Sequence, residues 1–373
     1  MRLLADLLRQ LTARGYSATV LVLTDDRELE NEFPPEVRII SADLFSTLRN
    51  RMRGIGRIAS LAKDHSLVIC HAELTPTYMA AIGTWIAGRP LMGWVRNDLQ
   101  RIFALRQRPA WLHRPAMRLI YPRLRKVLAC SNAIARELSV SFKMKNVVSV
   151  PNSVDGARIR LLATYPLPEC GLNYQEVFRL PVVICIAVLA FQKAHEVLIE
   201  AHAKLQQKGV RHNLLLVGEG PRRDELERMA REIGVANSVF FAGSVKNPYP
   251  LLAHSAVLAL SSRYEGFANV LAEALTLSIP IVSTDCDSGP REVLGDGHHG
   301  LLVRVDDPEG LAHAIETVLT KPELAAALRN RSAHAAAGLD SSIAAEKLIR
   351  LITKEFGPSS KRDASQEDNK ACM

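Results

Sequence analysis

The sequence lacks a long apolar run. Its longest uninterrupted apolar stretch, from Leu180 to Phe191, has 12 residues and includes a proline, whereas a helix that spans a bilayer needs about 20. The opening residues MRLLADLLRQL place charged and polar side chains among the leucines, and no small-residue cleavage site follows them. The sequence therefore predicts an amphipathic first helix, Arg2 to Arg14, and neither a transmembrane segment nor a signal peptide.

Cysteine is scarce and is never paired in a CxxC motif. The six cysteines are scattered, and most stand in apolar or strand-like contexts (Cys70, Cys130, Cys170, Cys185, Cys286 and Cys372). This usage indicates reduced, buried thiols in a cytoplasmic protein and argues against a zinc site. The chain has 373 residues, of which 48% are apolar and 23% charged. These values exclude disordered, collagen-like and coiled-coil proteins and predict about two globular domains.

Acidic residues are almost absent from one stretch of the chain. Arg96 to Lys126 holds nine basic residues against one acid, Asp98, and so accounts for the whole net charge of +8. The stretch also carries Phe103, Trp111 and Tyr121, and a second basic group precedes it (Arg49, Arg51, Arg53 and Arg57). Basic residues mixed with aromatics are expected on a surface that meets anionic lipid head groups; a solvated helical face is the alternative. No nucleic-acid motif accompanies the charge, so no nucleic-acid partner is expected.

Short β-rich runs alternate with helical periodicity along the chain, which predicts βαβ units and mostly parallel sheets. The strands expected in the first half are 18–23, 37–40, 67–70, 91–95, 127–130 and 147–150. Those expected in the second half are 182–188, 213–217, 239–241, 256–260, 279–283 and 301–303. The predicted fold class is α/β, with two Rossmann-like doubly wound domains that face each other across a cleft. Such domains bind ligands beyond the carboxyl ends of their strands, so the expected site lies between them.

The first domain is expected over residues 1–155 and the second over 156–340, followed by a C-terminal helix at 341–356 and a polar, disordered tail at 357–373. Three prolines and weak periodicity mark 151–180 as the connection. The first domain opens on a helix, without the central strand and glycine-rich turn that begin a Rossmann-like fold. Its sheet is therefore expected to lack its first strand and to be weakened or rearranged, unless the true start lies upstream.

One segment of the second half combines a helix start with two carboxylates. A strand ending at Leu260 is followed by a loop with Glu265 and Gly266 and then by a helix for which Asn269 is the expected N-cap. Free N–H groups at such a start bind phosphate oxygens, and Gly266 lets the backbone come close. Glu265 and Glu273 would then accept hydrogen bonds from sugar hydroxyls. The alternative is that Glu273 only complements the helix dipole and that Glu265 is a solvated loop acid.

These residues belong to a longer set of motifs. The second half contains SSRYEGFANVLAEAL, with its spacing of Glu265 and Glu273, and also TDCDSGPREVL, VGEGPRRDELE and FAGSVKNPYPLL. The first half contains CHAELTPTYMAA, GWVRNDL, ACSNAIARELS and PNSVD. In these motifs the chain, from Arg2 to about Phe356, resembles the retaining family 4 glycosyltransferases (glycosyl transferases group 1), two-domain enzymes of the GT-B fold that use nucleotide sugars.

The resemblance implies roles for individual residues. Glu265 matches the family's first glutamate, which contacts the donor sugar, and Glu273 matches the second, which binds the nucleotide ribose. Lys193 matches the lysine that neutralises the diphosphate leaving group. Backbone amides at the helix start would hold the sugar and diphosphate (Gly266, Phe267, Ala268 and Asn269). Relatives of this fold need no metal, so no metal or other cofactor is expected.

Three features depart from the family pattern. Val188 stands where such enzymes carry an arginine, five residues before the lysine, so half of the cationic clamp on the leaving group is absent. A positioned cation on a departing phosphate is a major electrostatic contribution to catalysis. Arg96 stands where relatives often place a histidine near the acceptor, and the N-terminal glycine-rich turn is missing. Together these departures leave an impaired enzyme open as an interpretation.

The function that the resemblance implies is transfer of a hexosyl or N-acetylhexosaminyl group, with retention, from a nucleotide diphosphate sugar to a lipid-linked or polysaccharide acceptor in envelope, lipopolysaccharide or capsule synthesis. The expected partners are the donor, that acceptor, and an anionic membrane surface bound through Arg96 to Lys126. The expected location is the cytoplasm, peripheral on the inner face of the membrane. Alternatives are a non-catalytic GT-B scaffold that binds a partner or membrane, favoured by Val188 and the missing strand, and another nucleotide-sugar enzyme such as an epimerase.

Overall fold

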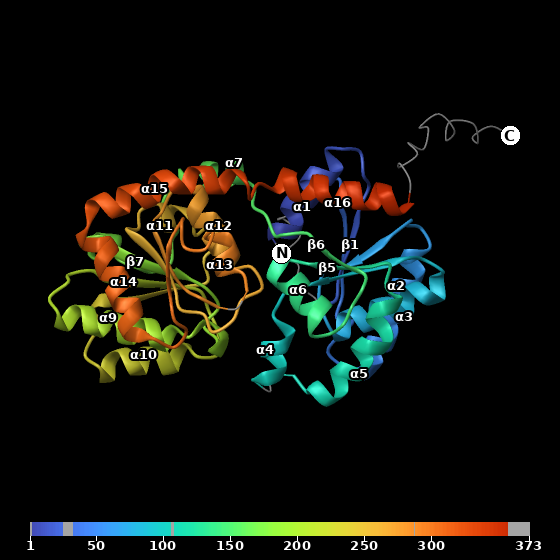
Figure 1. Ribbon diagram of the computed structural model, residues 1–373, viewed down its shortest axis with the longest axis horizontal. Coiled ribbons are helices and arrows are strands. Elements are labelled where there is room, and N and C mark those ends of the chain that lie inside the picture. The colour runs from blue at the N-terminus through green and yellow to red at the C-terminus, as the bar shows by residue number, and fades with distance from the viewer. Residues whose placement is uncertain (1, 25–32, 106–107, 287, 357–373) are drawn as a thin grey trace.

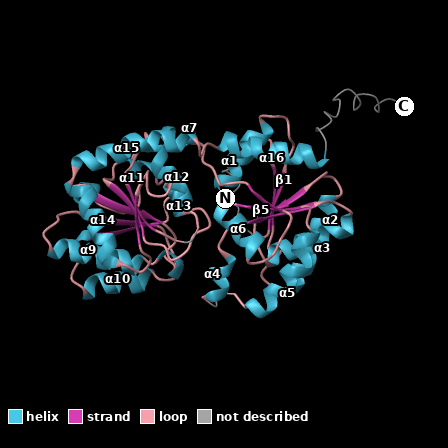
Figure 2. Ribbon diagram, viewed as in Figure 1, coloured by secondary structure: helices cyan, strands magenta, loops and turns pink. Residues whose placement is uncertain are grey.

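A computed structural model describes residues 2–24, 33–105, 108–286 and 288–356 of the chain. It contains two α/β units side by side (Figure 1). Helices cover both faces of the parallel strands in each unit (Figure 2). The predicted fold class is therefore confirmed, whereas the expected tail at 357–373 lies outside the described residues.

The N-terminal unit has two separate parallel sheets. β1 pairs with β2, while β3, β4, β5 and β6 form a four-stranded sheet in that order. The strands are β1 (Thr19–Val22), β2 (Arg38–Ser41), β3 (Val68–Cys70), β4 (Leu91–Val95), β5 (Lys126–Ala129) and β6 (Val147–Ser149). The helices are α1 (Arg2–Thr12), α2 (Leu48–Ala62), α3 (Thr75–Ala87), α4 (Leu99–Ala104), α5 (Ala110–Ile120), the 3₁₀ turn η2 (Tyr121–Arg123) and α6 (Asn132–Val140).

The C-terminal unit has one parallel sheet with the strand order β12-β11-β10-β7-β8-β9. Its strands are β7 (Val182–Ile186), β8 (Asn213–Val217), β9 (Val239–Gly243), β10 (Val257–Leu260), β11 (Ile281–Thr284) and β12 (Leu301–Val303). The helices before and between them are α7 (Gly156–Ala163), α8 (Tyr174–Val177), η3 (Phe191–Lys193), α9 (His195–Gln207), α10 (Arg223–Glu232), η4 (Ala236–Ser238), α11 (Tyr249–Ala253), α12 (Asn269–Thr276), α13 (Pro290–Val293), α14 (Pro308–Thr320), α15 (Pro322–Ala337) and α16 (Ser341–Phe356).

Each of the twelve predicted strands is confirmed, with ends that differ by about two residues or fewer. The continuous apolar runs were a reliable signal because central parallel strands are covered on both faces; Leu214, Leu215 and Leu216 of β8, for example, are fully buried. The connection at 151–180 is more regular than its weak periodicity predicted. It contains α7 and α8, and α7 begins where the Asp155 side chain caps the N–H of Arg158 at 2.9 Å.

The strands of the N-terminal unit do not form one continuous sheet. β1 and β3 do not pair, and the described residues place no strand between them. One core beneath α1 and α16 joins Leu8 and Leu348 to residues of the four-stranded sheet, among them Met92 and Trp94 of β4. Helix packing therefore covers this face of the unit, to which β2 and the residues before it also contribute apolar side chains.

The end of the chain returns to the N-terminal unit. Val154 forms a bridge with Asp340, its N–H donates to the carbonyl of Leu339 at 2.9 Å, and the N–H of Ser341 donates to the Val154 carbonyl at 2.9 Å. After this crossing, α16 lies against α1 (Figure 1). Leu348 of α16 is fully buried there. The last helix therefore stabilises the unit that begins the chain.

Among the residues that the structure describes, no helix combines the length and hydropathy needed to cross a membrane. The described cysteines are free thiols, and three of them are buried as the sequence predicted (Cys130, Cys185 and Cys286).

Truncation of Leu348 tests the packing of α16. We expect Leu348→Ala to lower the free energy of unfolding of the N-terminal unit by about 2 to 5 kcal/mol, because a buried leucine is replaced by a cavity. Urea unfolding followed by tryptophan fluorescence measures this unit, since Trp85, Trp94 and Trp111 all belong to it. Ile343→Ala is the matched control, because Ile343 lies on the same helix and is 48% exposed. Equal losses in both variants would contradict the packing of α16.

Candidate active site

The strand order of the second sheet reverses between β7 and β10. From β7 the sheet continues through β8 and β9, and from β10 it continues in the other direction through β11 and β12. Loops that leave such neighbouring strands in opposite directions create a crevice beyond the carboxyl ends, where α/β proteins bind ligands. Lys193 follows β7 and Glu265 follows β10. The fold therefore brings these two predicted residues to the same crevice.

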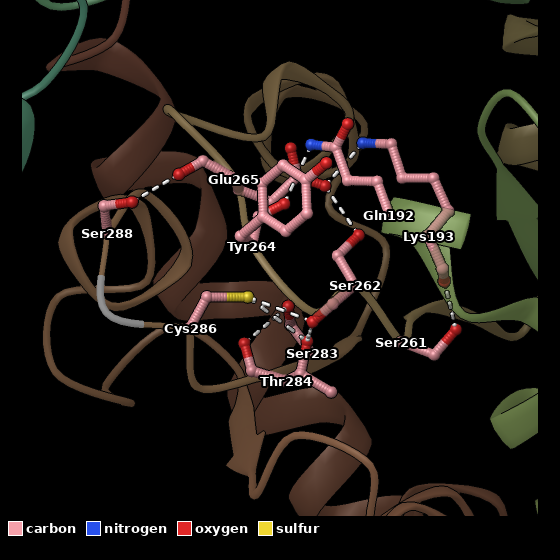
Figure 3. Close-up of polar contacts among 10 residues, drawn as sticks. All are labelled: Gln192, Lys193, Ser261, Ser262, Tyr264, Glu265, Ser283, Thr284, Cys286 and Ser288. Atoms are coloured by element: carbon pink, nitrogen blue, oxygen red, sulfur yellow. Dashed lines mark hydrogen bonds and ion pairs between the residues drawn. The ribbon is translucent and has the colours of Figure 1, made fainter. Parts of the chain in front are cut away.

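Lys193 and Glu265 form an ion pair (Figure 3). Their side chains are only 16% and 6% exposed, respectively. Lys193 ends η3, and Ala194, with a left-handed φ of 46°, separates this turn from α9. The hydroxyl of Ser261 donates to the Lys193 carbonyl at 2.8 Å. The main chain of Lys193 is thus held both by the η3 turn and by Ser261, which directly follows β10.

Hydroxyl groups hold Glu265 in place. Ser262 Oγ donates to Glu265 Oε1 at 2.6 Å, and Ser288 Oγ donates to the Glu265 main-chain carbonyl. Thr284 Oγ1 donates to the Ser262 carbonyl at 2.6 Å (Figure 3). The sequence did not identify these partners, although Ser262 lies within the motif SSRYEGFANVLAEAL and Thr284 and Ser288 lie within TDCDSGPREVL. Serine hydroxyls at strand ends beside a predicted carboxylate were the available signal.

His195 adds no positive charge next to Lys193. Its side chain is buried, and neither ring nitrogen has a hydrogen-bond partner in the described parts of the chain. Burial, reinforced by the nearby charges of Lys193 and Arg222, lowers the pKa of His195 to about 4. Arg222 is itself paired with Glu196 and Glu225. Lys193 is therefore the residue that brings a positive charge to Glu265.

The glycines of VGEGP allow two loops to touch. A Cβ on Gly218 would lie 2.0 Å from the Ala187 carbonyl oxygen, and a Cβ on Gly220 would lie 2.4 Å from that of Leu189. The loop after β8 can therefore lie against the loop after β7 only with glycine at these positions. Val188 stands between the two contacts and is 49% exposed. An apolar, partly exposed side chain thus occupies the position where the resemblance implies an arginine.

The start of α12 differs from the expectation. The N-cap is Ala268, with a left-handed φ of 64°. The prediction that Asn269 caps the helix is wrong, because Asn269 is the first helical residue and its Oδ1 accepts a hydrogen bond from Asn152 Nδ2 at 2.8 Å. Within the described residues, the main-chain N–H groups of Phe267, Ala268 and Asn269 have no hydrogen-bond partner. N–H groups in buried segments are nearly always paired, so these three groups leave room for a partner from outside the chain. Because they stand at the positive end of a helix, an anionic group is the partner that suits them.

Glu273 does not join the Lys193–Glu265 pair. It lies in α12, one turn after Asn269, and its Oε1 accepts a hydrogen bond from Tyr249 Oη at 3.5 Å. The two glutamates of the motif therefore have different partners, a lysine for Glu265 and a tyrosine for Glu273. The sequence did not identify Tyr249, which lies in the FAGSVKNPYPLL motif.

Arg96 lies after β4 in the N-terminal unit. Its main-chain N–H donates to Glu73 Oε2 at 3.2 Å, and its guanidinium contacts the His71 ring and lies 6.0 Å from the ring centroid of Trp94. Arg96, His71 and Trp94 line a cavity of about 10 Å³, together with Asn152. Burial is the main cause of the lowered pKa values of Arg96 and His71. His71 and Glu73 lie in the motif CHAELTPTYMAA, and nothing in its spacing connects them to Arg96.

The two units touch directly at the crevice. A Cβ on Gly266 would lie 1.8 Å from the Arg96 carbonyl oxygen and 3.0 Å from Cys130 Sγ. The Glu292 carboxylate accepts hydrogen bonds from the main-chain N–H groups of Asn132 at 2.8 Å and Ala133 at 3.3 Å, at the start of α6. These contacts join residues far apart in the sequence, so no local pattern predicted them.

No group of three potential metal ligands occurs in the described parts of the chain. In the Asp285-Cys286-Asp287 triplet, Asp285 is paired with Arg291, and Cys286 donates to the Ser262 carbonyl at 3.1 Å. Asp287 lies outside the described residues.

The chain matches two family models that together cover most of its length. Residues 2–158 match the model described as Glycosyltransferase Family 4, and residues 176–335 match the model described as Glycosyl transferases group 1. The first match falls on the N-terminal unit, and the second contains β7 to α14 with the Lys193–Glu265 pair.

Curated relatives are similar over part of their length. An N-acetylgalactosaminyltransferase of Campylobacter jejuni, which acts on N-acetylgalactosamine-N,N'-diacetylbacillosaminyl-diphospho-undecaprenol, is 30% identical over 63% of this chain and 61% of that protein. LpsE of Rhizobium meliloti, a lipopolysaccharide core biosynthesis glycosyltransferase, is 38% identical over 40% of this chain and 43% of that protein. The matched regions thus span less than two thirds of these relatives.

Solved structures share the fold of the whole chain. Anabaena Alr3699/HepE, in complex with UDP and glucose, superposes with a TM-score of 0.79 at 22% identity over 94% of this chain and 95% of that chain. The apo form of the lipopolysaccharide outer core galactosyltransferase WaaB gives a TM-score of 0.67 at 16% identity over 95% of both chains. At these identities the likeness establishes the architecture.

Gly266→Ala tests the contact between the units. We expect the added methyl group to separate Gly266 from the Arg96 carbonyl, since a distance of 1.8 Å is sterically forbidden. The radius of gyration measured by small-angle X-ray scattering should increase, and the buried Cys130 thiol should react faster with a maleimide. Gly56→Ala is the control, because a Cβ there meets nothing within 4 Å. Unchanged scattering and thiol reactivity in Gly266→Ala would contradict the contact.

Proposed function

Since the chain belongs to the group 1 and family 4 glycosyltransferases and has the GT-B fold, we propose that it is a retaining glycosyltransferase. It transfers a sugar from a nucleotide diphosphate sugar to a lipid-linked or polysaccharide acceptor in the synthesis of an envelope or capsule glycan. The Lys193–Glu265 ion pair at the reversal of strand order carries this proposal. It joins a cation suited to a departing diphosphate to a carboxylate suited to sugar hydroxyls.

The start of α12 provides the second half of the donor site. The N–H groups of Phe267, Ala268 and Asn269 have no partner in the described part of the chain. Together with the positive end of the helix dipole they suit the diphosphate and the sugar. Gly266 lets the backbone approach these groups, and Glu273 suits the ribose hydroxyls because a carboxylate accepts hydrogen bonds from them. Catalysis on this proposal consists of positioning and electrostatic stabilisation of the leaving group.

Lys193 changes its partner in the proposed reaction. Before the donor binds, its ammonium group is compensated by Glu265. A diphosphate at the α12 start offers a second anionic partner, so the lysine can stabilise the negative charge that develops as the glycosidic oxygen leaves. Glu265, held by Ser262, then steadies the donor sugar during a front-face displacement. Both side chains are largely buried. Electrostatic interactions are stronger in such a low-dielectric environment than in water.

Two observations support the proposed acceptor: the position of Arg96 in the N-terminal unit and the substrates named for two relatives. Arg96 belongs to the loop that touches Gly266, so its main chain lies beside the proposed donor sugar. The Campylobacter relative acts on an undecaprenol-linked substrate and the Rhizobium relative in lipopolysaccharide core synthesis. These names support a lipid-linked or polysaccharide acceptor here, and with it a location at the inner face of the cytoplasmic membrane.

Donor binding is the first test. We expect isothermal titration with UDP, GDP and their common sugar conjugates to show micromolar binding of one base, equivalent to about 8 kcal/mol. Absence of binding up to millimolar concentration, from a chain shown to be folded, would favour a non-catalytic scaffold of the same fold. Release of nucleotide diphosphate and formation of a glycosylated acceptor then distinguish transfer from epimerisation, which needs no acceptor.

Substitution of the ion pair tests the assigned roles. We expect Glu265→Gln and Lys193→Ala each to lower turnover by about a hundredfold or more, as found when a preorganised electrostatic group is removed. Each single substitution also leaves one buried group without its partner and so lowers stability, but the loss of turnover should exceed what the fraction of unfolded protein at the assay temperature explains. Lys204→Ala and Glu309→Gln are matched controls, because these residues form a more exposed ion pair in the same unit. Turnover losses that merely follow losses of stability would refute the roles.

The substitution Val188→Arg tests whether a second cation near the leaving group raises the rate of transfer. Val188 is half exposed, so an arginine fits there without burying its charge. We expect Val188→Arg to raise turnover by about tenfold or more, because a second cation stabilises the leaving diphosphate. Val188→Gln controls for size and polarity. Equal rates for the two variants would show that this position does not contact the leaving group.

A further inference from the structure

The guanidinium of Arg96 carries a charge for which the described residues supply no counter-ion. Arg96 directly follows β4, and its guanidinium contacts the His71 ring and lies 6.0 Å from the ring centroid of Trp94. No carboxylate in the described ranges forms an ion pair with it. A cation removed from water is costly unless an anion compensates it. Arg96 is therefore ready to receive an anion from outside the described chain.

The two titratable neighbours of Arg96 do not fill this role. Glu73 Oε2 accepts a hydrogen bond from the Arg96 main-chain N–H at 3.2 Å, and Glu73 Oε1 accepts one from Asn97 Nδ2 at 2.7 Å. Glu73 thus holds the loop after β4 and affects the guanidinium only from a distance. Burial is the main cause that lowers the pKa of His71 well below its usual range, so its ring is neutral.

Trp94 adds a second donor at the same place. Its side chain is 3% exposed, and its indole Nε1 has no hydrogen-bond partner in the described parts of the chain. Buried donors are nearly always paired, so this one also calls for an acceptor. Trp94 and Arg96 line the cavity of about 10 Å³, which has room for one water-sized group. One oxygen atom of a larger anion fits such a space.

Two contacts connect this cavity to the proposed donor loop. Asn152, which lines the cavity, donates to Asn269 Oδ1 at 2.8 Å, at the first residue of α12. The Arg96 carbonyl lies against Gly266, which begins the approach to the same helix. The cavity therefore borders the crevice in which, on the proposed function, the donor sugar and the acceptor meet.

We infer that Arg96 binds a carboxylate on one of these two sugars, so that the enzyme acts on a uronate. A carboxylate is planar and matches the guanidinium fork with two parallel, charge-assisted hydrogen bonds. The donor diphosphate is less suited to Arg96, because Lys193 and the α12 start that suit it belong to the other unit. The inference rests on the proposed function, since it specifies the charge of one substrate of that reaction.

Paired donors test whether the uronate is the transferred sugar. Isothermal titration of the full chain compares UDP-glucuronate with UDP-glucose and GDP-mannuronate with GDP-mannose. If the donor is the source, the uronate conjugate of the preferred base binds at least tenfold more tightly. Arg96→Gln should remove this preference and change the affinity for the free nucleoside diphosphate by less than twofold. Arg53→Gln, at an exposed arginine of the same unit, is the control and should keep the preference.

Paired saccharides test whether the uronate belongs to the acceptor. Saturation-transfer NMR compares digalacturonate with its neutral methyl ester, both with and without the nucleoside diphosphate. If the acceptor is the source, the charged saccharide binds at least tenfold more tightly, and Arg96→Gln removes the difference. Arg96→Lys should keep only part of it in either experiment, because lysine retains the charge and loses the planar fork.

Two results would overturn the inference. One is the absence of an Arg96-dependent uronate preference with both donors and saccharides. The other is a loss in Arg96→Gln that is equal for the free nucleoside diphosphate and for every conjugate, which would assign the arginine to the leaving group or to folding. Nucleotide binding without a uronate preference refutes this inference alone. If no nucleotide binds, the proposed function fails, and the saccharide experiment still measures the role of Arg96.

Discussion

The buried ion pair between Lys193 and Glu265 is the interaction on which the candidate site depends. Removing two charges from water is costly, and their attraction offsets this cost only with good geometry and further hydrogen bonds. Here Ser262 donates to the carboxylate, while Ser261 and Ser288 fix the main chain of the two partners. A well-packed apolar pair could give the fold equal or greater stability. The presence of two charges at this point therefore fits a role in binding and chemistry.

The geometry of the sheet explains why the pair can form. Lys193 and Glu265 are 72 residues apart, yet the strands before them are neighbours in the sheet. The same reversal of strand order opens a crevice, and the α12 start adds N–H groups that have no partner among the residues the structure describes. The N-terminal unit closes on this crevice through Gly266, where only a glycine permits contact with the Arg96 carbonyl. The loop after β10 thus contributes both to the proposed donor site and to the contact between the two units.

The basic stretch from Arg96 to Lys126 and the proposed donor site lie in different units of the molecule. The stretch belongs to the N-terminal unit, while Lys193, Glu265 and Glu273 belong to the other. Arg96 and Cys130 are the residues of the N-terminal unit that lie against Gly266.

The sequence by itself determined the fold class, the twelve strands and the candidates Lys193, Glu265 and Glu273. Strand runs and motif spacing are local, so they can be recognised without knowledge of contacts between distant residues. Only the tertiary structure revealed that Lys193 pairs with Glu265 and that Glu292 binds the α6 start. It also corrected the cap of α12, because Asn269 is engaged by Asn152 from far along the chain. The physical reason is the same in each case: hydrogen bonds and ion pairs form between groups that the fold makes adjacent, and sequence spacing does not encode that adjacency.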